Sequence, residues 1–358
     1  MMESSRYTAA ALVALPLLLL TVSSCLPVTH AVAMTAAGSP TSAPMGTSGK
    51  AQSNNWAVIV SSSRFLFNYR HTGNALTMYH LLRQHGIDDD HILLFLSDSF
   101  ACDARNVYPA EIFDQPPRSE GDVNGHADRN LYGCSAQVDY AGTDVDVRRF
   151  LSVLQGRYDE NTPPTRRLLS DENSNIIIYI AGHGARSYFK FQDTEFLSSS
   201  DISETLMMMH QQRRYGRVVF MADTCHAIAL CEHVEAPNVV CLAASDAESE
   251  SFSGTFEQNI GVHMGSFWMS EMYALLNGTS CSNPLTRRIG EDKVSVLHQS
   301  LFDFNYHPHR ANLDLGESKP AHRDAVNHPN AVKEWIVADF MCAEEPVTIP
   351  VEVRYDLE

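Results

Sequence analysis

The sequence is poor in basic residues. Its 26 Lys and Arg stand against 43 Asp and Glu, which gives a formal net charge of −17 at pH 7. A surface of this sign repels phosphate backbones and anionic lipid headgroups, and it argues against both as partners. The 358 residues suffice for one large α/β domain, or for one domain with a smaller lobe.

Long apolar runs are also scarce. The run at residues 9–22 is short for a membrane span, and small residues follow it at 31–33, so residues 1–33 predict a cleaved signal peptide. Residues 34–53, rich in Ser, Gly, Ala, Thr and Pro, predict a disordered leader. We expect a catalytic domain over residues 54–345. Residues 346–358 predict a C-terminal tail with strand character, and no later stretch reaches membrane length.

Cysteines and one sequon fit a secretory compartment. Eight Cys are present, and Cys25 leaves with the predicted signal peptide, so seven remain. An odd number predicts a reactive free thiol or a bridge to another chain. Asn277 begins an Asn-Gly-Thr sequon and is a predicted glycan acceptor.

Two apolar strings end on reactive side chains. Residues 176–184 deliver His183 between two glycines, and residues 217–225 deliver Cys225. Continuous runs of β-branched and aromatic residues are typical of parallel strands that are buried on both faces. The carboxyl ends of such strands share one edge of the sheet, so a base and a nucleophile would meet there.

The same residues also have purely structural interpretations. A Cys after a strand is often a small buried hydrophobe, and a His between glycines can simply mark a turn. The occurrence of both, in the order His then Cys, favours catalysis. Gly184 has no Cβ to keep a ligand away from its backbone N–H, so Gly184 and Cys225 are predicted to donate to an oxyanion.

The remaining periodicity alternates strands with helices. Strands are predicted at 55–61, 91–96, 175–181, 217–222 and 239–244, and helices at 74–84, 143–155, 201–214, 265–277 and 291–304. The first Asp residues of the 143–155 helix suit its positive end, and Ser200 or Asp201 is the expected N-cap of the 201–214 helix. Residues 97–140 are loop-rich.

The order of these elements resembles the caspase-haemoglobinase fold, which is an α/β fold with a mostly parallel central sheet and helices on both faces. Residues 54–60 and 68–71 resemble the legumain-type cysteine peptidases. Other strings resemble one branch of that family more closely, the catalytic subunits of glycosylphosphatidylinositol (GPI) transamidases; they lie at residues 101–106, 167–171, 182–184, 189–193, 212–215 and 223–225. His226 and Ala185 depart from the pattern of that branch. The lack of a C-terminal membrane helix resembles the short kinetoplastid forms.

The resemblance implies a cysteine-dependent transamidase. In that reaction Cys225 cleaves the C-terminal attachment signal of a precursor protein with His183 as base, and the thioester then passes to the ethanolamine amine of a GPI lipid. No cofactor is required. The first alternative is a legumain-like asparaginyl endopeptidase, which stops at hydrolysis, and an inactive scaffold subunit is a further one.

Further site residues follow from the same resemblance. Asn68 is implied to orient His183, although a plain turn residue is an equal alternative. Arg70, His71 and Ser245 match positions that shape the primary substrate pocket, with ordinary loop residues as the alternative. Cys102 lies in a segment through which the family is joined to a membrane partner. We therefore expect an intermolecular disulfide, with an internal bridge to Cys134 as the alternative.

The implied partners are membrane subunits of the transamidase complex, precursor proteins and the GPI lipid, without nucleic acid. The implied location is the endoplasmic reticulum lumen, with membrane association through the partner subunits. Two metal sites stay open from the residues alone. Cys225, His226, Cys231 and His233 are of zinc-ligand type, and acidic segments around Asp89 and Asp139 could hold a structural calcium ion.

Overall fold

The computed structural model describes residues 54–115, 130–133, 136–277 and 340. The chain divides into the units Met1–Thr47 and Ser48–Glu358, and all described residues belong to the second unit. Five predictions lie outside the described residues: the signal peptide at 1–33, the leader at 34–53, the helix at 291–304, the tail at 346–358 and the bridge to Cys134.

Six strands build the central sheet. They are β1 (Asn55–Ser61), β2 (Ile92–Leu96), β3 (Tyr140–Ala141), β4 (Asn175–Ala181), β8 (Arg217–Asp223) and β9 (Val239–Ala243). Their order is β3-β2-β1-β4-β8-β9, and every neighbouring pair is parallel. The five predicted strands are confirmed to within one residue at each end, because their apolar runs are buried on both faces of the sheet.

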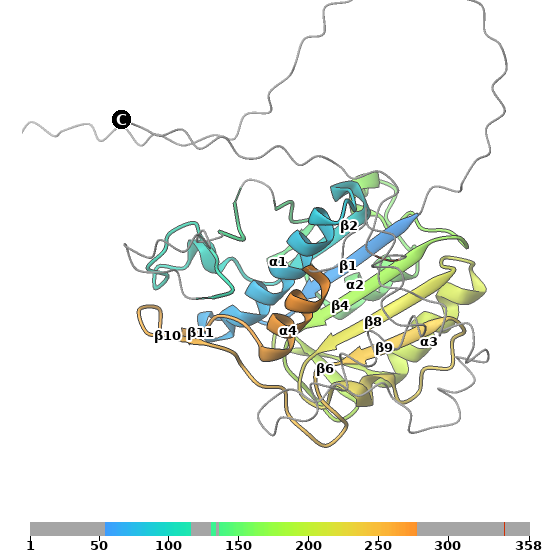
Figure 1. Ribbon diagram of the computed structural model, residues 1–358. Helices are drawn as coiled ribbons and strands as arrows, with labels where there is room; N and C mark the ends of the chain where they lie inside the picture. Colours follow the sequence, from blue (N-terminus) through green and yellow to red (C-terminus); the bar gives the residue numbers. More distant parts are fainter. Residues whose placement is uncertain (1–53, 116–129, 134–135, 278–339, 341–358) are drawn as a thin grey trace, which may run out of the picture. The chain divides into compact units, whose positions relative to one another are not determined.

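Helices cover both faces. On one face lie α1 (Tyr69–Gln84) and α4 (Phe267–Asn277), which Figure 1 shows together over the near side of the sheet. On the other lie α2 (Val147–Leu154) and α3 (Ser199–Gln211). Alternate residues of β1 feed the two cores: Ile59 packs with the first pair of helices and Val58 with the second. The predicted fold class is confirmed.

All four predicted helix starts within the described residues are wrong, that of α4 by two residues, and the structure shows a local reason for the other three. Helix α1 begins five residues early, because the 3-10 helix η1 (Leu66–Asn68) leads directly into it. Helix α2 begins after Asp146, whose side chain accepts the Arg149 N–H and caps the helix. Helix α3 is capped by Ser198, and the expected cap Asp201 occupies the third position of a reciprocal capping box.

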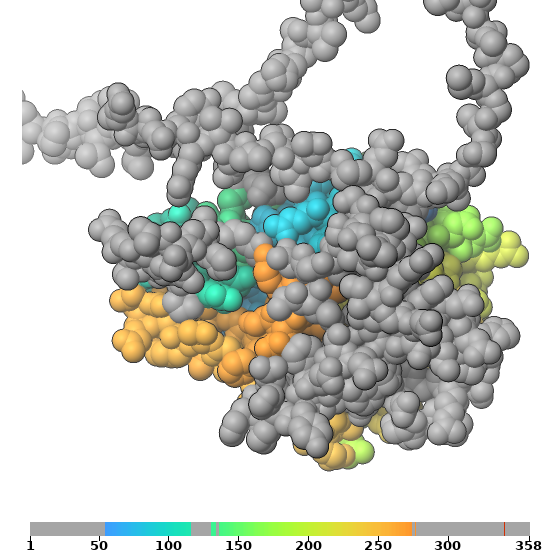
Figure 2. Space-filling view, viewed as in Figure 1, coloured from blue at the N-terminus to red at the C-terminus, as the bar shows by residue number. Residues whose placement is uncertain are grey.

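Two small sheets were not predicted. An antiparallel sheet comprises β5 (Gly184–Ala185), β6 (Tyr188–Phe191) and β7 (Glu195–Ser198), and a hairpin comprises β10 (Phe256–Glu257) and β11 (Val262–His263). The segment after β11 packs on α1 and on residues 113–114; a Cβ on Gly73 would lie 2.6 Å from the Met264 carbonyl oxygen. In Figure 2 the orange surface of this segment adjoins the teal surface of residues 100–115.

The sheet topology locates a crevice. From β1 the chain adds β2 and β3 on one side, and β4, β8 and β9 on the other. In open α/β sheets, ligands bind at the carboxyl ends of the strands where the order reverses, which here is between β1 and β4. No helix in the described part of the chain has the length and apolarity to cross a membrane.

Candidate active site

Two adjacent strands deliver the predicted pair to one edge of the sheet. Ala181, the last residue of β4, lies opposite Asp223, the last residue of β8. His183 and Cys225 each follow two residues later, and both are partly exposed. The structure therefore places the two residues at corresponding positions beyond neighbouring strand ends, next to the crevice.

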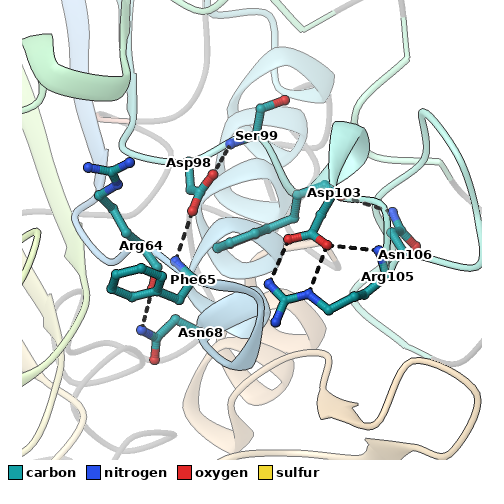
Figure 3. A network of polar contacts seen from close by, with 9 residues as sticks. Arg64, Phe65, Asn68, Asp98, Ser99, Asp103, Arg105 and Asn106 are labelled. Carbon is teal, nitrogen blue, oxygen red and sulfur yellow. Dashed lines mark hydrogen bonds and ion pairs between the residues drawn. The ribbon is translucent and has the colours of Figure 1, made fainter.

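Asn68 fixes the ring of His183. Asn68 is fully buried in the loop after β1, and its Oδ1 lies 2.7 Å from His183 Nε2. Its Nδ2 donates to the Arg64 carbonyl oxygen at 2.6 Å (Figure 3). Because the amide nitrogen is engaged by a carbonyl, Oδ1 accepts from the imidazole, and the proton of neutral His183 sits on Nε2. Nδ1 is then the nitrogen that can accept a proton.

His183 lies in surroundings that favour its neutral form. Burial lowers the pKa of His183, and the Arg70 guanidinium also lowers it. The His71 ring meets the His183 ring edge-on, with centroids 4.9 Å apart. Burial, then Arg70 and His183, lower the pKa of His71 well below its ordinary value. His183 is therefore unprotonated at neutral pH, as a general base must be.

Gly184 lets the two strand ends approach. An added Cβ would lie 2.5 Å from Thr224 Oγ1 and 3.2 Å from the Cys225 carbonyl oxygen. The residue after His183 is thus packed directly against the loop that carries the thiol. The Cys225 backbone N–H makes no hydrogen bond to another described residue. It is therefore free to donate to a ligand.

A buried carboxyl group lies under both strand ends. Oδ2 of Asp223 accepts from Asn74 Nδ2 at 2.8 Å, and from the hydroxyls of Tyr179 and Ser266 at 2.9 Å each. Burial raises the pKa of Asp223 in spite of these donors. The Arg70 guanidinium acts electrostatically on Asp223 and on Cys225.

Ser245 holds the loop that carries Cys225, at residues 224–227. Its hydroxyl donates to the Thr224 carbonyl oxygen at 2.9 Å and accepts the Ala227 N–H at 3.0 Å, on either side of Cys225. The residue is fully buried. On the open side, Ser251 Oγ lies 3.9 Å from Cys225 Sγ. Ser251 was not identified from the sequence, where nothing distinguishes it from its neighbours.

The sequence of this region matches a peptidase family model. The model of the peptidase C13 family matches residues 55–286. The chain belongs to the peptidase C13 family. It is 40% identical over 234 residues to the GPI-anchor transamidase of Schizosaccharomyces pombe, covering 65% of this chain and 59% of that protein. It is 43% identical over 209 residues to that of Saccharomyces cerevisiae, covering 58% and 49%.

The human GPI-anchor transamidase is 40% identical over 233 residues, covering 64% of this chain and 57% of that protein. The match thus spans about half the length of these curated relatives. Among solved structures, caspase-1 from Spodoptera frugiperda aligns with a TM-score of 0.40 at 8% identity, covering 74% of this chain and 84% of that chain.

The implied substrate contacts occupy different environments in this C13 chain. Arg70 is partly buried beside Cys225. The His71 side chain is buried and its Nδ1 lies 2.8 Å from Ser63 Oγ. The Ser245 hydroxyl has both of its hydrogen bonds within the nucleophile loop. As placed, Arg70 is the one of the three with exposed surface at the site.

Residues 190–193, Lys-Phe-Gln-Asp, belong to one of the segments that resemble the transamidase branch, and they also have a structural role. The Lys190 N–H donates to the His183 carbonyl oxygen at 2.8 Å, and the Lys190 carbonyl accepts from Ser62 Oγ at 2.6 Å. Strand β6 thereby holds the backbone of His183 in place. Sequence periodicity does not reveal this contact, because β6 is a short strand outside the central sheet.

The zinc alternative is wrong, because Cys231 is bonded to Cys241. Among the described residues, no group of three or more His, Cys, Asp or Glu could hold a metal ion. Asp139 Oδ2 accepts the Leu94 N–H at 2.9 Å, and Asp89 Oδ1 accepts the Tyr79 hydroxyl at 2.5 Å. Burial, then the nearby Asp89, raise the pKa of Asp139 to about 7. Calcium at these two residues stays a prediction.

The structure also places two further predicted residues. Cys102 is a free, exposed thiol at the end of the 3-10 helix η3 (Phe100–Cys102). Asn277 is the last residue of α4. Both are placed by the structure, and their modifications stay predictions.

Proposed function

We propose that this C13 chain is the catalytic subunit of a GPI-anchor transamidase. The observation that carries the proposal is the hydrogen bond by which Asn68 orients His183, at the end of the strand next to the one that carries Cys225. About 40% identity to proteins named GPI-anchor transamidase supports the choice of reaction.

In the first half-reaction, His183 Nδ1 removes the thiol proton of Cys225, and the thiolate attacks a backbone carbonyl near the C-terminus of a precursor protein. The tetrahedral oxyanion accepts hydrogen bonds from the N–H groups of Gly184 and Cys225. When the C–N bond breaks, His183 gives its proton to the departing amine of the signal peptide. A thioester on Cys225 remains.

In the second half-reaction, the ethanolamine amine of a GPI lipid attacks the thioester. His183 takes a proton from the amine, the C–S bond breaks, and the sulfur leaves as a thiolate that is reprotonated by His183. One amide bond is broken and one is formed, so neither ATP nor a redox cofactor is consumed. The amine must be positioned and water kept away, because water competes for the thioester.

The alternative of a legumain-like endopeptidase shares the first half-reaction and differs in the acceptor. We propose to supply the complex with a precursor and with hydrazine as a small amine, and to analyse the new C-terminus by mass spectrometry. A hydrazide supports transfer. A free carboxylate at undiminished yield as hydrazine is raised would instead assign hydrolysis.

The catalytic pair is tested in cells that lack the native subunit. Cys225→Ala and His183→Ala should each abolish surface display of GPI-anchored proteins without lowering the amount of the chain. The exposed His233 is a matched control, and His233→Ala should retain display. Display at the wild-type level with either site variant would refute the assignment.

Substrate contact is proposed for Arg70, with His71 and Ser245 shaping the pocket from behind. His71 supports the His183 ring, and Ser245 supports the Cys225 loop. Substitution of Arg70 should therefore raise KM, whereas changes at the other two should lower kcat.

Partners are proposed in line with the resemblance: membrane subunits of the complex, precursor proteins and the GPI lipid, in the endoplasmic reticulum lumen. The exposed Cys102 thiol supports an intermolecular disulfide with one of these subunits. A non-reducing gel should show a higher-mass band that is absent from Cys102→Ser. A monomer-sized band from cells that express the whole complex would oppose the bridge.

A further inference from the structure

We propose that Asp98 is a positioning residue for His183. Its carboxylate holds residues 64–68 in the conformation in which Asn68 orients the imidazole. The inference rests on the proposed function only in taking His183 as the base that activates Cys225.

A chain of hydrogen bonds leads from Asp98 to the imidazole. Asp98 Oδ2 accepts the Phe65 N–H at 2.8 Å, and the adjacent Arg64 carbonyl accepts Asn68 Nδ2 at 2.6 Å. Asn68 Oδ1 then meets His183 Nε2 at 2.7 Å. Figure 3 shows Asp98 between Phe65 and Ser99, with the Asn68 amide turned towards Arg64. The second carboxylate oxygen accepts the Ser99 N–H at 2.8 Å, which orients the carboxylate itself.

The same two loops are joined step by step beyond the ends of β1 and β2. The Ser97 N–H donates to the Ser61 carbonyl oxygen at 3.0 Å, and the Ser97 hydroxyl donates to the Ser63 carbonyl oxygen at 2.7 Å. The bond from Phe65 to Asp98 is the next contact in this series. Asp98 therefore makes the last of the hydrogen bonds that join the segments after β1 and β2, and it is the one nearest in sequence to Asn68.

Phe65 needs this anchor because its backbone is strained. Its φ of 71° and ψ of 140° lie in a region that bulky residues rarely adopt, and such a conformation costs free energy. Burial does not offset the cost, because the ring is 52% exposed and stacks on Phe67, which is 61% exposed. A charge-assisted hydrogen bond from its N–H to Asp98 supplies a compensating interaction.

Asp103 provides a matched comparison in the same region. Its carboxylate accepts the Arg105 N–H at 2.8 Å and pairs with the Arg105 guanidinium at 2.9 Å. Within the described chain its side chain makes no hydrogen bond or ion pair with residues 64–68, and Figure 3 shows it turned to Arg105. Asp103→Asn thus removes a similar surface carboxylate without disturbing the connection to Asn68.

The experiment measures how fast iodoacetamide alkylates Cys225 in the full chain, with the modified peptide quantified by mass spectrometry across pH 5–9. This readout reports activation of the thiol by His183 and needs no transamidase substrate. Because a hydrogen bond contributes a modest net free energy, Asp98→Ala should lower the rate at pH 7 about threefold, and Asn68→Ala about tenfold. Asp98→Asn keeps an acceptor oxygen and should retain most of the rate.

A double-variant cycle separates positioning from general stability. If Asp98 acts through Asn68, Asp98→Ala should cause no further loss when Asn68→Ala is already present. The Asp103→Asn control should alkylate at the wild-type rate. Equal losses from Asp98→Ala with and without Asn68 would overturn the inference, as would an unchanged rate in a folded Asp98→Ala chain. If His183→Ala also left the rate unchanged, the proposed base itself would fail.

Discussion

The two ends of the catalytic pair are held in different ways. On the His183 side, the imidazole is held by the side chain of Asn68, which hydrogen-bonds one ring nitrogen and leaves the other open. On the Cys225 side, the backbone is held instead, by the Ser245 hydroxyl and by the close approach of Gly184. Whether a histidine can act as a base towards a given group depends on which ring nitrogen already carries a proton. A nucleophile next to an oxyanion site depends on where its own N–H points.

The His183 side and the Cys225 side are connected through one buried group, the carboxyl group of Asp223. Asp223 ends β8 just before the nucleophile loop, and its carboxyl group is bonded to Tyr179 of β4, which precedes His183. Asn74 of α1 donates to the same oxygen. A substitution among Asp223 and its hydrogen-bond partners should therefore weakly affect the positions of both His183 and Cys225. A substitution nearer the surface should strongly affect only one of them.

The largest effect is expected at the contact between the two ends. Gly184→Ala should lower kcat about a hundredfold, because the new Cβ would be 2.5 Å from Thr224 Oγ1 and would displace the loop that carries the oxyanion donor. KM should change less. The activity assay is hydrazide formation. Gly133→Ala is the control, since among the described residues its Cβ would meet only the Asn130 carbonyl oxygen, at 3.9 Å.

The next effect tests the His183 side alone. Asn68→Ala should reduce kcat about tenfold and should not abolish turnover, because the ring loses its orientation but keeps its acceptor nitrogen. The amount of folded chain, measured by circular dichroism, serves as the reference. A rate within error of the wild type would remove Asn68 from the site.

Local sequence patterns predicted His183 and Cys225 as the reacting residues, and the family resemblance implied Asn68 and Ser245, but neither indicated the buried supports Asn74 and Asp223. His183 and Cys225 end long apolar runs, and a run buried on both faces is a strong local signal. Their supports come from distant segments: Asn74 and Asp223 are 149 positions apart. Such pairings depend on how α1 crosses the sheet, and no periodicity within one segment encodes them.

The same distinction explains the helix starts and Ser245. The periodic apolar positions of α2 are local and were recognised, whereas its first residue depends on which carboxylate, Asp144 or Asp146, reaches a backbone N–H. Ser245 was recognised through its position in the family. Its hydroxyl points into the nucleophile loop because β9 lies beside β8.

The Cys225 side is tested by Ser245→Ala. The change leaves the Ala227 N–H and the Thr224 carbonyl without their buried partner, so the free energy of unfolding should fall by about 2 kcal/mol. The rate should fall about threefold as the loop loosens. Urea unfolding and the hydrazide assay measure the two effects. Ser249→Ala, in the segment that follows β9 and contains Ser245, is the control and should change neither: it removes a hydroxyl that accepts the Asp246 N–H at 3.2 Å and keeps the Ser249 carbonyl oxygen, which accepts the His226 N–H.

The smallest effect is expected at the Asp223 carboxyl group, where the change in the free energy of unfolding depends on pH. Burial raises the pKa of Asp223 above that of an unfolded carboxyl, about 3.9. The contribution of Asp223 to stability is therefore fully present below the unfolded pKa and is lost as the pH rises through the folded pKa. The Tyr179 hydroxyl stabilises the ionised form, so Tyr179→Phe should raise the pKa of Asp223 further and extend this loss to higher pH.

Tyr179→Phe should consequently cost about 1 kcal/mol of unfolding free energy at pH 8 and less at pH 5. The ring itself is preserved, including its stacking on Trp268, so a lost hydroxyl is the only change. Tyr215→Phe is matched in burial, but its hydroxyl donates to the neutral Pro237 carbonyl, and its cost should not vary with pH. Thermal unfolding of both variants at the two pH values makes the comparison. A Tyr179→Phe cost that is equal at pH 5 and pH 8 would contradict this prediction, because it would show that the Asp223 carboxyl group keeps the same ionisation state at both pH values.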